Sequence, residues 1–168
     1  MANHVKENEL HRVVVTAIIY NDEGKFLVTK RTDDQKVYPG QWTVPGGGLE
    51  ADDYVNEDKT TTDAWYFIIE KVLKREVLEE VNVEITKLKY LLDLIFVRPD
   101  GIPVIVLSYY AKYDGGEVAL DPTELSEYKW VTADEAMQLD MIEGIAEEIE
   151  MTDKILKGEK DVEFRIRK

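Results

Sequence analysis

The sequence predicts an α/β layered fold, and two observations carry this prediction. Apolar segments rich in β-branched residues alternate with short turns, which is typical of strands in a sheet. One long amphipathic segment in the middle of the chain, and two more near its end, have the spacing of helices that pack on such a sheet. A chain of 168 residues suits a single domain with one sizeable core.

The first half of the chain is expected to form strands and loops. Asn21–Gly24 and Pro39–Gly40 have the composition of turns. The apolar runs around these turns predict three strands, at Arg12–Tyr20, Phe26–Lys30 and Trp42–Val44. Pro45–Gly48 then packs no large side chains and leaves the backbone accessible. The polar, acidic stretch Glu50–Thr62 predicts a loop.

The second half is expected to begin with the longest helix. This helix is predicted over Ala64–Val81, with Asp63 as its N-terminal cap and Asn82 in the left-handed conformation at its end. Pro99–Gly101 predicts a turn. The remaining patterns predict strands at Tyr90–Val97, Val104–Tyr113 and Lys129–Val131, followed by helices at Ala133–Leu139 and Ile142–Lys157.

The bulk composition limits the class of protein. Hydrophobic residues make up 44% and charged residues 33% of the chain, which is ordinary for a globular protein. No apolar run is long enough to cross a bilayer, and the N-terminus lacks the apolar core of a signal peptide. The sequence contains no cysteine, which excludes disulfides and thiolate metal sites. We therefore expect a cytoplasmic protein that does not bind membranes.

The net charge limits the ligands. A formal net charge of -14, with no basic stripe to offset it, disfavours binding to nucleic acid. If the ligand is a phosphate compound, a cation must lie between it and the protein, and a divalent metal ion is the natural candidate.

A group of glutamates on the central helix is the strongest chemical signal. Ile69, Val72 and Leu73 form an apolar stripe at helical spacing, and the same steps continue to Glu76 and Glu80. The face that should enter the core therefore ends in two carboxylates that repel each other. Partial burial of such a pair costs folding free energy unless a cation neutralises the repulsion between the two charges.

The neighbours of these two glutamates favour a metal site over a solvated acidic face. Glu79 lies beside them, and Arg75 is placed to pair with Glu79 one turn later. Clustered carboxylate oxygens suit a hard ion such as magnesium or manganese. The glycine run upstream adds bare backbone that can approach phosphates or supply a carbonyl ligand.

These two segments resemble the Nudix box of the MutT-like Nudix hydrolases. Arg75–Val83 is similar to the second half of the box, and Pro45–Glu50 is similar to its opening. The resemblance covers roughly residues 12 to 150. Outside the box, it includes the segments Glu127–Val131 and Asp134–Ala136. It implies a mixed β-sheet sandwiched between α-helices (α/β/α), in a domain over residues 12–157 with tails at residues 1–11 and 158–168.

The box departs from the family pattern in two places. About a dozen extra residues separate the glycines from Arg75, so we expect a polar insert near residues 53–62, which a surface loop accepts at modest entropic cost. The insert leaves open whether Asp53, Glu57 or neither serves as the first carboxylate of the box. The second departure is Asn82 in place of the box glycine, a substitution that suits the same helix end.

The resemblance also implies a set of site residues. Glu76, Glu79 and Glu80, with the carbonyl of Gly47, would bind Mg²⁺, and Mn²⁺ would also suit them. Among downstream carboxylates that act in catalysis, Glu124 is the first candidate, ahead of Glu117 and Glu127. Which glutamate is the general base stays open. The remaining expected site residues are Arg75 in catalysis, and Gly46, Gly47, Gly48 and Arg31 in substrate binding.

The implied reaction is metal-dependent hydrolysis of a nucleoside diphosphate linked to a further group. A nucleoside triphosphate, ordinary or oxidised, cleaved to the monophosphate and pyrophosphate is the first candidate. ADP-ribose or another sugar nucleotide is the second. A nucleotide-sensing domain without turnover and a protein-interaction domain are the alternatives outside catalysis. Many relatives are dimers, so a homodimer is also left open.

Overall fold

The computed structural model describes residues 6–166, and eight strands within them form one mixed sheet. At its centre, β1 (Arg12–Tyr20) pairs in parallel with β7 (Pro103–Gly115) along its whole length. The other strand pairings are antiparallel. The six remaining strands are β2 (Phe26–Arg31), β3 (Trp42–Thr43), β4 (Gly46–Gly48), β5 (Glu84–Ile85), β6 (Lys89–Val97) and β8 (Leu125–Val131). Residues 1–5 and 167–168 of the expected tails lie outside the described residues.

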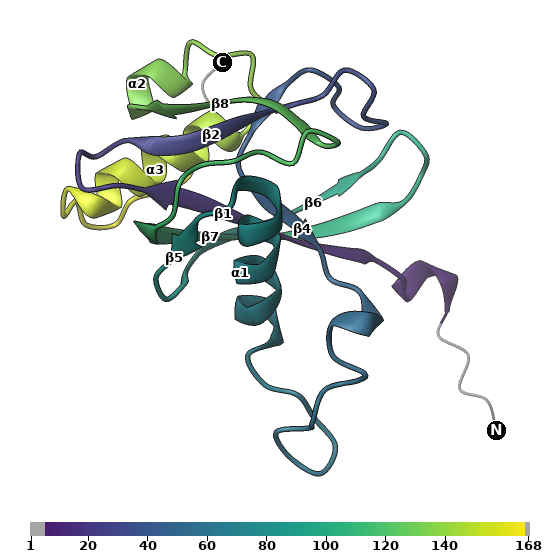
Figure 1. Ribbon diagram of the computed structural model, residues 1–168. Coiled ribbons are helices and arrows are strands. Elements are labelled where there is room, and N and C mark those ends of the chain that lie inside the picture. Colours follow the sequence, from purple (N-terminus) through teal and green to yellow (C-terminus); the bar gives the residue numbers. More distant parts are fainter. Residues whose placement is uncertain (1–5, 167–168) are drawn as a thin grey trace.

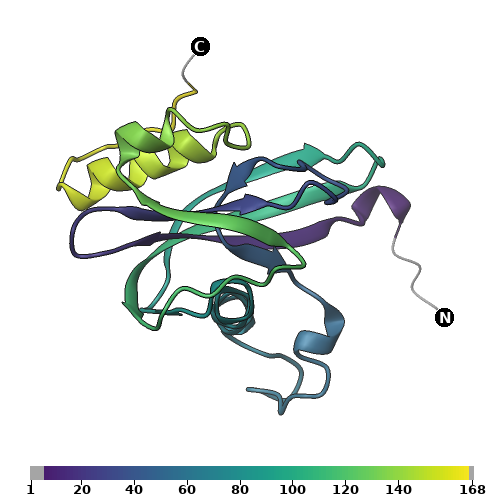
Figure 2. The same ribbon diagram turned by 45° about the horizontal axis from the view of Figure 1, so that its top comes forward.

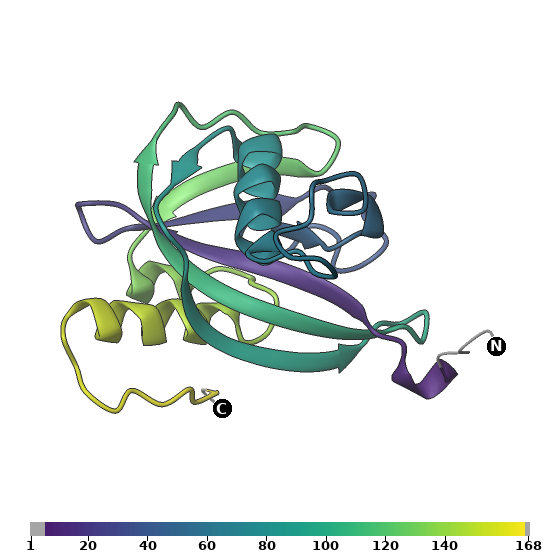
Figure 3. The same ribbon diagram turned by 90° about the horizontal axis from the view of Figure 1, so that it is seen from below.

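Helices cover both faces of this sheet, which confirms the predicted α/β/α sandwich. Side chains alternate along β1, so Val15 and Ala17 pack in the cluster that contains helix α1 (Ile68–Val81). Ile18 packs in the second cluster, with α2 (Ala133–Ala136) and α3 (Ile145–Leu156). Figure 3 shows α1 and the yellow α3 on opposite sides of the purple strand β1.

The central helix begins later than the sequence predicts. It starts at Ile68 because Phe67 has a φ of 62°, in the left-handed region, where a helix cannot continue backwards. The prediction that it runs from Ala64 with Asp63 as its cap is therefore wrong. Its end is as predicted, since Asn82 has a φ of 56° and its N–H donates to the carbonyl of Leu78 at 3.0 Å.

Several other bounds differ from the predictions. The strand predicted at Lys129–Val131 is longer, because residues from Leu125 onward also pair with β2. The last helix begins after Gly144, whose φ of 94° interrupts the segment predicted to be helical from Ile142. Two short strands, β4 and β5, are absent from the prediction, because neither has an apolar run that marks it. A short 3₁₀ turn (Ala51–Asp53) interrupts the predicted loop.

The segment between β4 and α1 projects away from the sheet. Figure 1 shows it as a long loop below α1, and Figure 2, which views α1 end-on, shows the sheet between α1 and α3. Trp65 holds part of this loop together, since its Nε1 donates to the carbonyl of Glu57 at 2.9 Å and its ring lies 5.2 Å from that of Tyr54. Within residues 6–166, no helix is both long enough and apolar enough to cross a membrane.

Candidate active site

The glycine run forms a strand that α1 approaches closely. Gly46 pairs with Thr16 and Gly48 with Val14, so β4 extends the sheet beside the first half of β1. A Cβ atom at Gly46 would lie 2.2 Å from the carbonyl oxygen of Val15, and one at Gly47 would lie 2.2 Å from the carboxylate carbon of Glu76. Glycine is therefore needed at both positions, to fit the sheet and to admit the glutamate.

Glu80 contacts the same strand through a hydrogen bond. Its Oε2 accepts the backbone N–H of Gly46 at 3.0 Å. Burial raises the pKa of Glu80 to about 8, against the opposing effect of the Gly46 hydrogen bond, and the charges of Glu124 and Glu76 raise the pKa further. The cation that opposes this shift is Arg31. The carboxylate is therefore held in a setting that disfavours its charge.

Glu76 lies one turn earlier on α1 and is also shielded from solvent. Its side chain is 17% exposed, and its Oε1 accepts a hydrogen bond from Arg75 at 2.7 Å. Burial raises the pKa of Glu76, and the neighbouring charge of Arg75 opposes this effect. Glu76 and Glu80 flank the buried stripe of α1, which continues through Val77 and Val81. The acidic pair thus borders the core, close to where the sequence places it.

Arg75 connects three carboxylates from two segments. Its Nη1 donates to Glu79 at 2.7 Å, which is the predicted pair one helical turn apart, and its Nη2 donates to Asp53 at 2.7 Å. Asp53 ends the 3₁₀ turn of the loop, and its side chain is 11% exposed. Glu57 instead forms an ion pair with Lys71 at 2.6 Å. Of the two carboxylates that the sequence leaves open, the structure brings Asp53 to the arginine.

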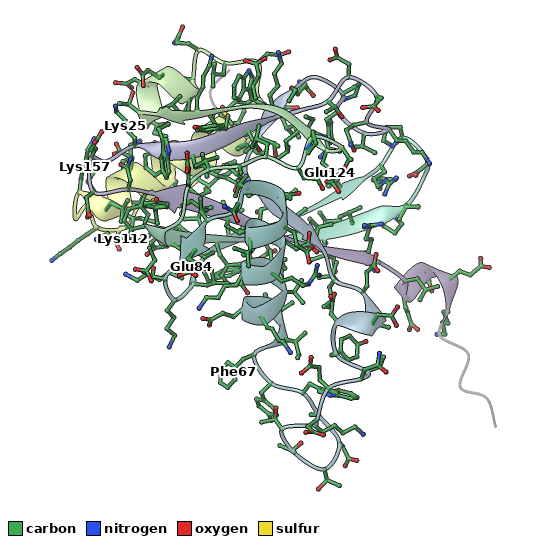
Figure 4. The ribbon with its side chains drawn as sticks, in the orientation of Figure 1. Lys25, Phe67, Glu84, Lys112, Glu124 and Lys157 are labelled. Atoms are coloured by element: carbon green, nitrogen blue, oxygen red, sulfur yellow. The ribbon has the colours of Figure 1, made fainter. Side chains whose placement is uncertain are left out.

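The loop before β8 brings a further carboxylate to Glu80. The backbone N–H of Asp121 donates to the carbonyl of Glu80 at 2.9 Å, which fixes this loop against the end of α1. Glu124 follows in the same loop, and Figure 4 shows it beside the upper end of α1. Glu127 lies outside this site and pairs with Lys30 at 2.8 Å, while the carbonyl of Glu117 accepts from Asn82.

A cavity of about 910 Å³ opens beside these carboxylates. Glu80, Glu124 and Gly46 line one end of it, together with Arg31. The loop after β2 fixes the guanidinium of Arg31, because its Nε donates to the carbonyl of Val37 at 2.9 Å. The cavity thus combines a cation with exposed backbone at the end where the carboxylates lie.

Two further residues, which the sequence does not indicate as site residues, also line this cavity. Arg12 lies at the start of β1, and a Cβ atom at Gly48 would meet its Nη2 at 2.7 Å, so its guanidinium lies against the glycine strand. Glu148 lies on α3 and is 3% exposed. No sequence motif marks either residue, because only the pairing of β4 with β1 and the packing of α3 place them here.

The carboxylates fit a divalent cation, although they do not converge on one point. Within residues 6–166, no group of three His, Cys, Asp or Glu side chains is arranged to hold a metal ion. Arg75 instead binds Glu79 and one oxygen of Glu76. Burial raises the pKa values of Glu76 and Glu80, so an added cation would relieve the cost of keeping both charged. Oxygen donors of this kind suit a hard ion.

Comparison with protein families identifies the domain. The family model described as "NUDIX domain" matches residues 10–58 and 68–151. Residues 59–67, which the model leaves unmatched, belong to the projecting loop. Among curated proteins, nucleoside triphosphatase NudI of Escherichia coli is 29% identical over 140 residues, which cover 77% of this chain and 88% of that protein.

Solved structures share the fold. A MutT protein from Methanosarcina mazei Go1 is 23% identical and superimposes with a TM-score of 0.64, over 88% of this chain and 96% of that one. The NUDIX domain of Shewanella oneidensis NrtR, solved with ADP ribose, is 17% identical with a TM-score of 0.70, over 92% and 95% of the two chains. With a family model that matches most of its length, this chain belongs to the NUDIX family and is a MutT-like pyrophosphohydrolase.

Proposed function

We propose that this protein hydrolyses a nucleoside triphosphate to the nucleoside monophosphate and pyrophosphate, with Mg²⁺ as its cofactor and Mn²⁺ as a substitute. The observation that carries the proposal is Glu80, a shielded carboxylate that contacts the Gly46 N–H at the end of a nucleotide-sized cavity. The similarity to a nucleoside triphosphatase of Escherichia coli supports the choice of substrate.

Metal binding is assigned to the carboxylates of α1. Nudix hydrolases generally use divalent metals, and we assign Glu76 and Glu80 as the leading ligands, with Glu79 and the Gly47 carbonyl as further ones. When bound, the ion supplies positive charge to the phosphates and acidifies a coordinated water. Arg75 is a positioning residue in this scheme, because it holds Glu76 and Glu79 at 2.7 Å and sets where their free oxygens point.

The remaining residues bind the phosphates and remove a proton. Arg31 and the backbone N–H groups of Gly46–Gly48 are assigned to the phosphate oxygens, which guanidinium and amide donors suit. Water attacks a phosphorus of the bridge between the α- and β-phosphates, the P–O bond of that bridge breaks, and pyrophosphate leaves. The proton of the attacking water passes to a carboxylate. We assign this role to Glu124, because it lines the cavity near Glu80 and has no assigned ligand role.

A substrate panel tests the proposal. Phosphate and pyrophosphate release are measured with ordinary and oxidised nucleoside triphosphates, ADP-ribose and sugar nucleotides, each with Mg²⁺, Mn²⁺ or EDTA. The expected result is pyrophosphate release from a triphosphate that EDTA abolishes. Cleavage of ADP-ribose or a sugar nucleotide alone would replace the substrate assignment and keep the site. Ligand binding without any cleavage would contradict the proposal and identify a sensing domain.

A further inference from the structure

The cavity has a second polar end, which the proposed reaction does not use. There, Ser108 on β7 donates its hydroxyl to Oε2 of Glu148 on α3, at 2.6 Å. Ser108 is 0% exposed and Glu148 is 3% exposed, yet Glu148 lines the cavity. Burial raises the pKa of Glu148 to about 7, against the opposing hydrogen bond from Ser108. Burying a carboxylate with a single side-chain hydrogen bond costs folding free energy. Such a costly group is a candidate for a functional role.

The sheet fixes how far this end lies from the proposed phosphate site. Gly46 pairs with Thr16 on β1, and Thr16 pairs with Ser108 on β7, so the three residues lie in one row across adjacent strands. Two strand spacings separate Gly46 from Ser108, which corresponds to about 10 Å. This separation is comparable to the length of a nucleoside from its 5′-phosphate to the far edge of its base.

Apart from Thr16, the walls between the two ends are formed largely by apolar side chains. Val14 and Val106 lie on the sheet side of the cavity, and Leu94, Phe96 and Ile145 also line it. Such surfaces suit the flat faces of a base. The cavity therefore presents arginines at one end, an apolar middle and a carboxylate at the other end. A nucleotide presents anionic phosphates, an apolar base face and polar base edges in the same order.

We propose that Glu148 determines base specificity by accepting a hydrogen bond from the exocyclic amino group of the nucleobase. This inference rests on the proposed nucleotide substrate. Above pH 7, where Glu148 is ionised, its carboxylate is an acceptor without a donor of its own, so it binds an amino group and repels a keto oxygen at the same place. Ser108 is a positioning residue that holds the carboxylate from the sheet side. Buried hydrogen-bonding groups of this kind discriminate strongly between substrates, because the wrong partner leaves them unsatisfied.

Matched amino and keto nucleotides test the inference. The kcat/KM values are measured at pH 8, where Glu148 is largely ionised, for ATP against ITP, CTP against UTP, and GTP against XTP, in which an amino group and a keto oxygen exchange at one position. The wild-type enzyme is expected to prefer the amino member of its best pair by at least tenfold. Glu148→Gln is expected to bring this ratio close to one, because the amide both donates and accepts. Ser108→Ala is expected to reduce the ratio by a smaller factor.

Glu150→Gln is the matched control, because Glu150 lies on the same helix but pairs with Lys154 at 3.0 Å outside the cavity. Its amino-to-keto ratio should equal that of the wild type. Melting temperatures show that each variant is folded. A wild-type ratio near one, or a ratio that Glu148→Gln leaves unchanged, overturns the inference while hydrolysis still supports the proposed function.

A binding measurement separates the two proposals. The affinity of the same nucleotides for the Glu80→Gln protein is measured by calorimetry, so that base recognition is read without turnover. Tighter binding of the amino member, lost in the double variant with Glu148→Gln, supports the inference even if the wild type hydrolyses no triphosphate. Absence of nucleotide binding by both the wild-type and the Glu80→Gln proteins overturns the inference. The substrate panel then tests the proposed hydrolysis independently.

Discussion

Nη2 of Arg75 lies 2.7 Å from Oδ1 of Asp53, a residue 22 positions earlier in the chain. This ion pair connects the start of the projecting loop to the middle of α1, on the side where Arg75 also holds Glu76 and Glu79. The loop therefore helps to orient the carboxylates, although most of it lies away from them (Figure 1). An insertion at this point leaves the site intact because Asp53 precedes most of the extra residues.

Removal of Asp53 should impair catalysis more than folding. In Asp53→Ala, Arg75 loses one charged partner and no longer fixes the glutamates as firmly. Because a charge-assisted hydrogen bond contributes about 1.5–3 kcal/mol, kcat/KM should fall about tenfold or more. Asp52→Ala is the matched control, since Asp52 is exposed in the same 3₁₀ turn. Equal activity in the two variants, measured by pyrophosphate release, would show that the ion pair does not position the site.

Two neighbouring glycines should respond differently to the same substitution. Gly46→Ala places a Cβ atom against the carbonyl of Val15 on β1, and the backbone there cannot yield cheaply. It should destabilise the fold by about 1–3 kcal/mol. The nearest atoms to a Cβ at Gly47 belong to the side chain of Glu76, which can move, so Gly47→Ala should keep most of the stability and lose most of the activity. Urea unfolding and a hydrolysis assay on both variants distinguish these effects. A severe loss of stability in Gly47→Ala with normal activity would contradict the placement of Glu76.

Glu148→Gln should stabilise the protein in a pH-dependent way. The folded-state pKa of Glu148 is raised to about 7 from an ordinary value of 4.5, so folding favours the protonated carboxyl. The stability that this proton contributes is fully present below pH 4.5 and is lost as the pH rises through 7. Glutamine does not titrate, so the variant does not lose this stability as the pH rises, and its amide oxygen still accepts the hydrogen bond from Ser108.

At pH 8, the free energy of unfolding of the variant should therefore exceed that of the wild type by an amount on the order of 3 kcal/mol. At pH 4.5 the two free energies should differ little. Denaturant unfolding at several pH values measures the difference. The charge of Glu147 also faces Glu148, so Glu147→Gln should lower the pH dependence only slightly. A margin that does not change with pH would show that Glu148 is not the titrating group.

Trp65 should hold the projecting loop without stabilising the domain. Its ring contacts Tyr54 and Lys59, and its indole N–H bonds the carbonyl of Glu57, all within the loop. Trp65→Ala should therefore speed proteolytic cleavage between residues 54 and 67, while the melting temperature stays within a few degrees. Phe67→Ala is the control, because Phe67 is 81% exposed and points away from the domain in Figure 4. Equal cleavage rates would contradict the role of Trp65.

Periodicity predicts the parts of this fold that repeat a pattern. The strand over Arg12–Tyr20 is found with the predicted bounds, because a long β-branched run leaves little choice. The end of α1 is also found as predicted, since Asn82 suits a left-handed residue. The start of α1 could not be predicted, because bulky residues rarely adopt the left-handed conformation and no sequence signal marks Phe67 as one that does.

Residue spacing alone predicts the candidate site only where the site lies on one helix, and Gly46, Arg31 and Glu124 were expected from the family resemblance. The spacing of Glu76 and Glu80 along α1 is local, so the sequence indicates that they share a face. The contact of Arg75 with Asp53 crosses an insert of unusual length, and the approach of Glu148 depends on how α3 packs on β7. Contacts of this kind follow from the assembled sheet, which a single sequence does not specify.

The most direct test of the proposed function compares pyrophosphate release from a nucleoside triphosphate by the wild type, Glu80→Gln and Glu84→Gln. Glu84 is exposed on β5, so its variant controls for loss of charge alone (Figure 4). With Mg²⁺ present, the wild type and Glu84→Gln should release pyrophosphate at equal rates, and Glu80→Gln should be slower by a factor of about 100 or more. Equal rates in all three proteins, or release that EDTA leaves unchanged, would contradict a metal-dependent hydrolase built on Glu80.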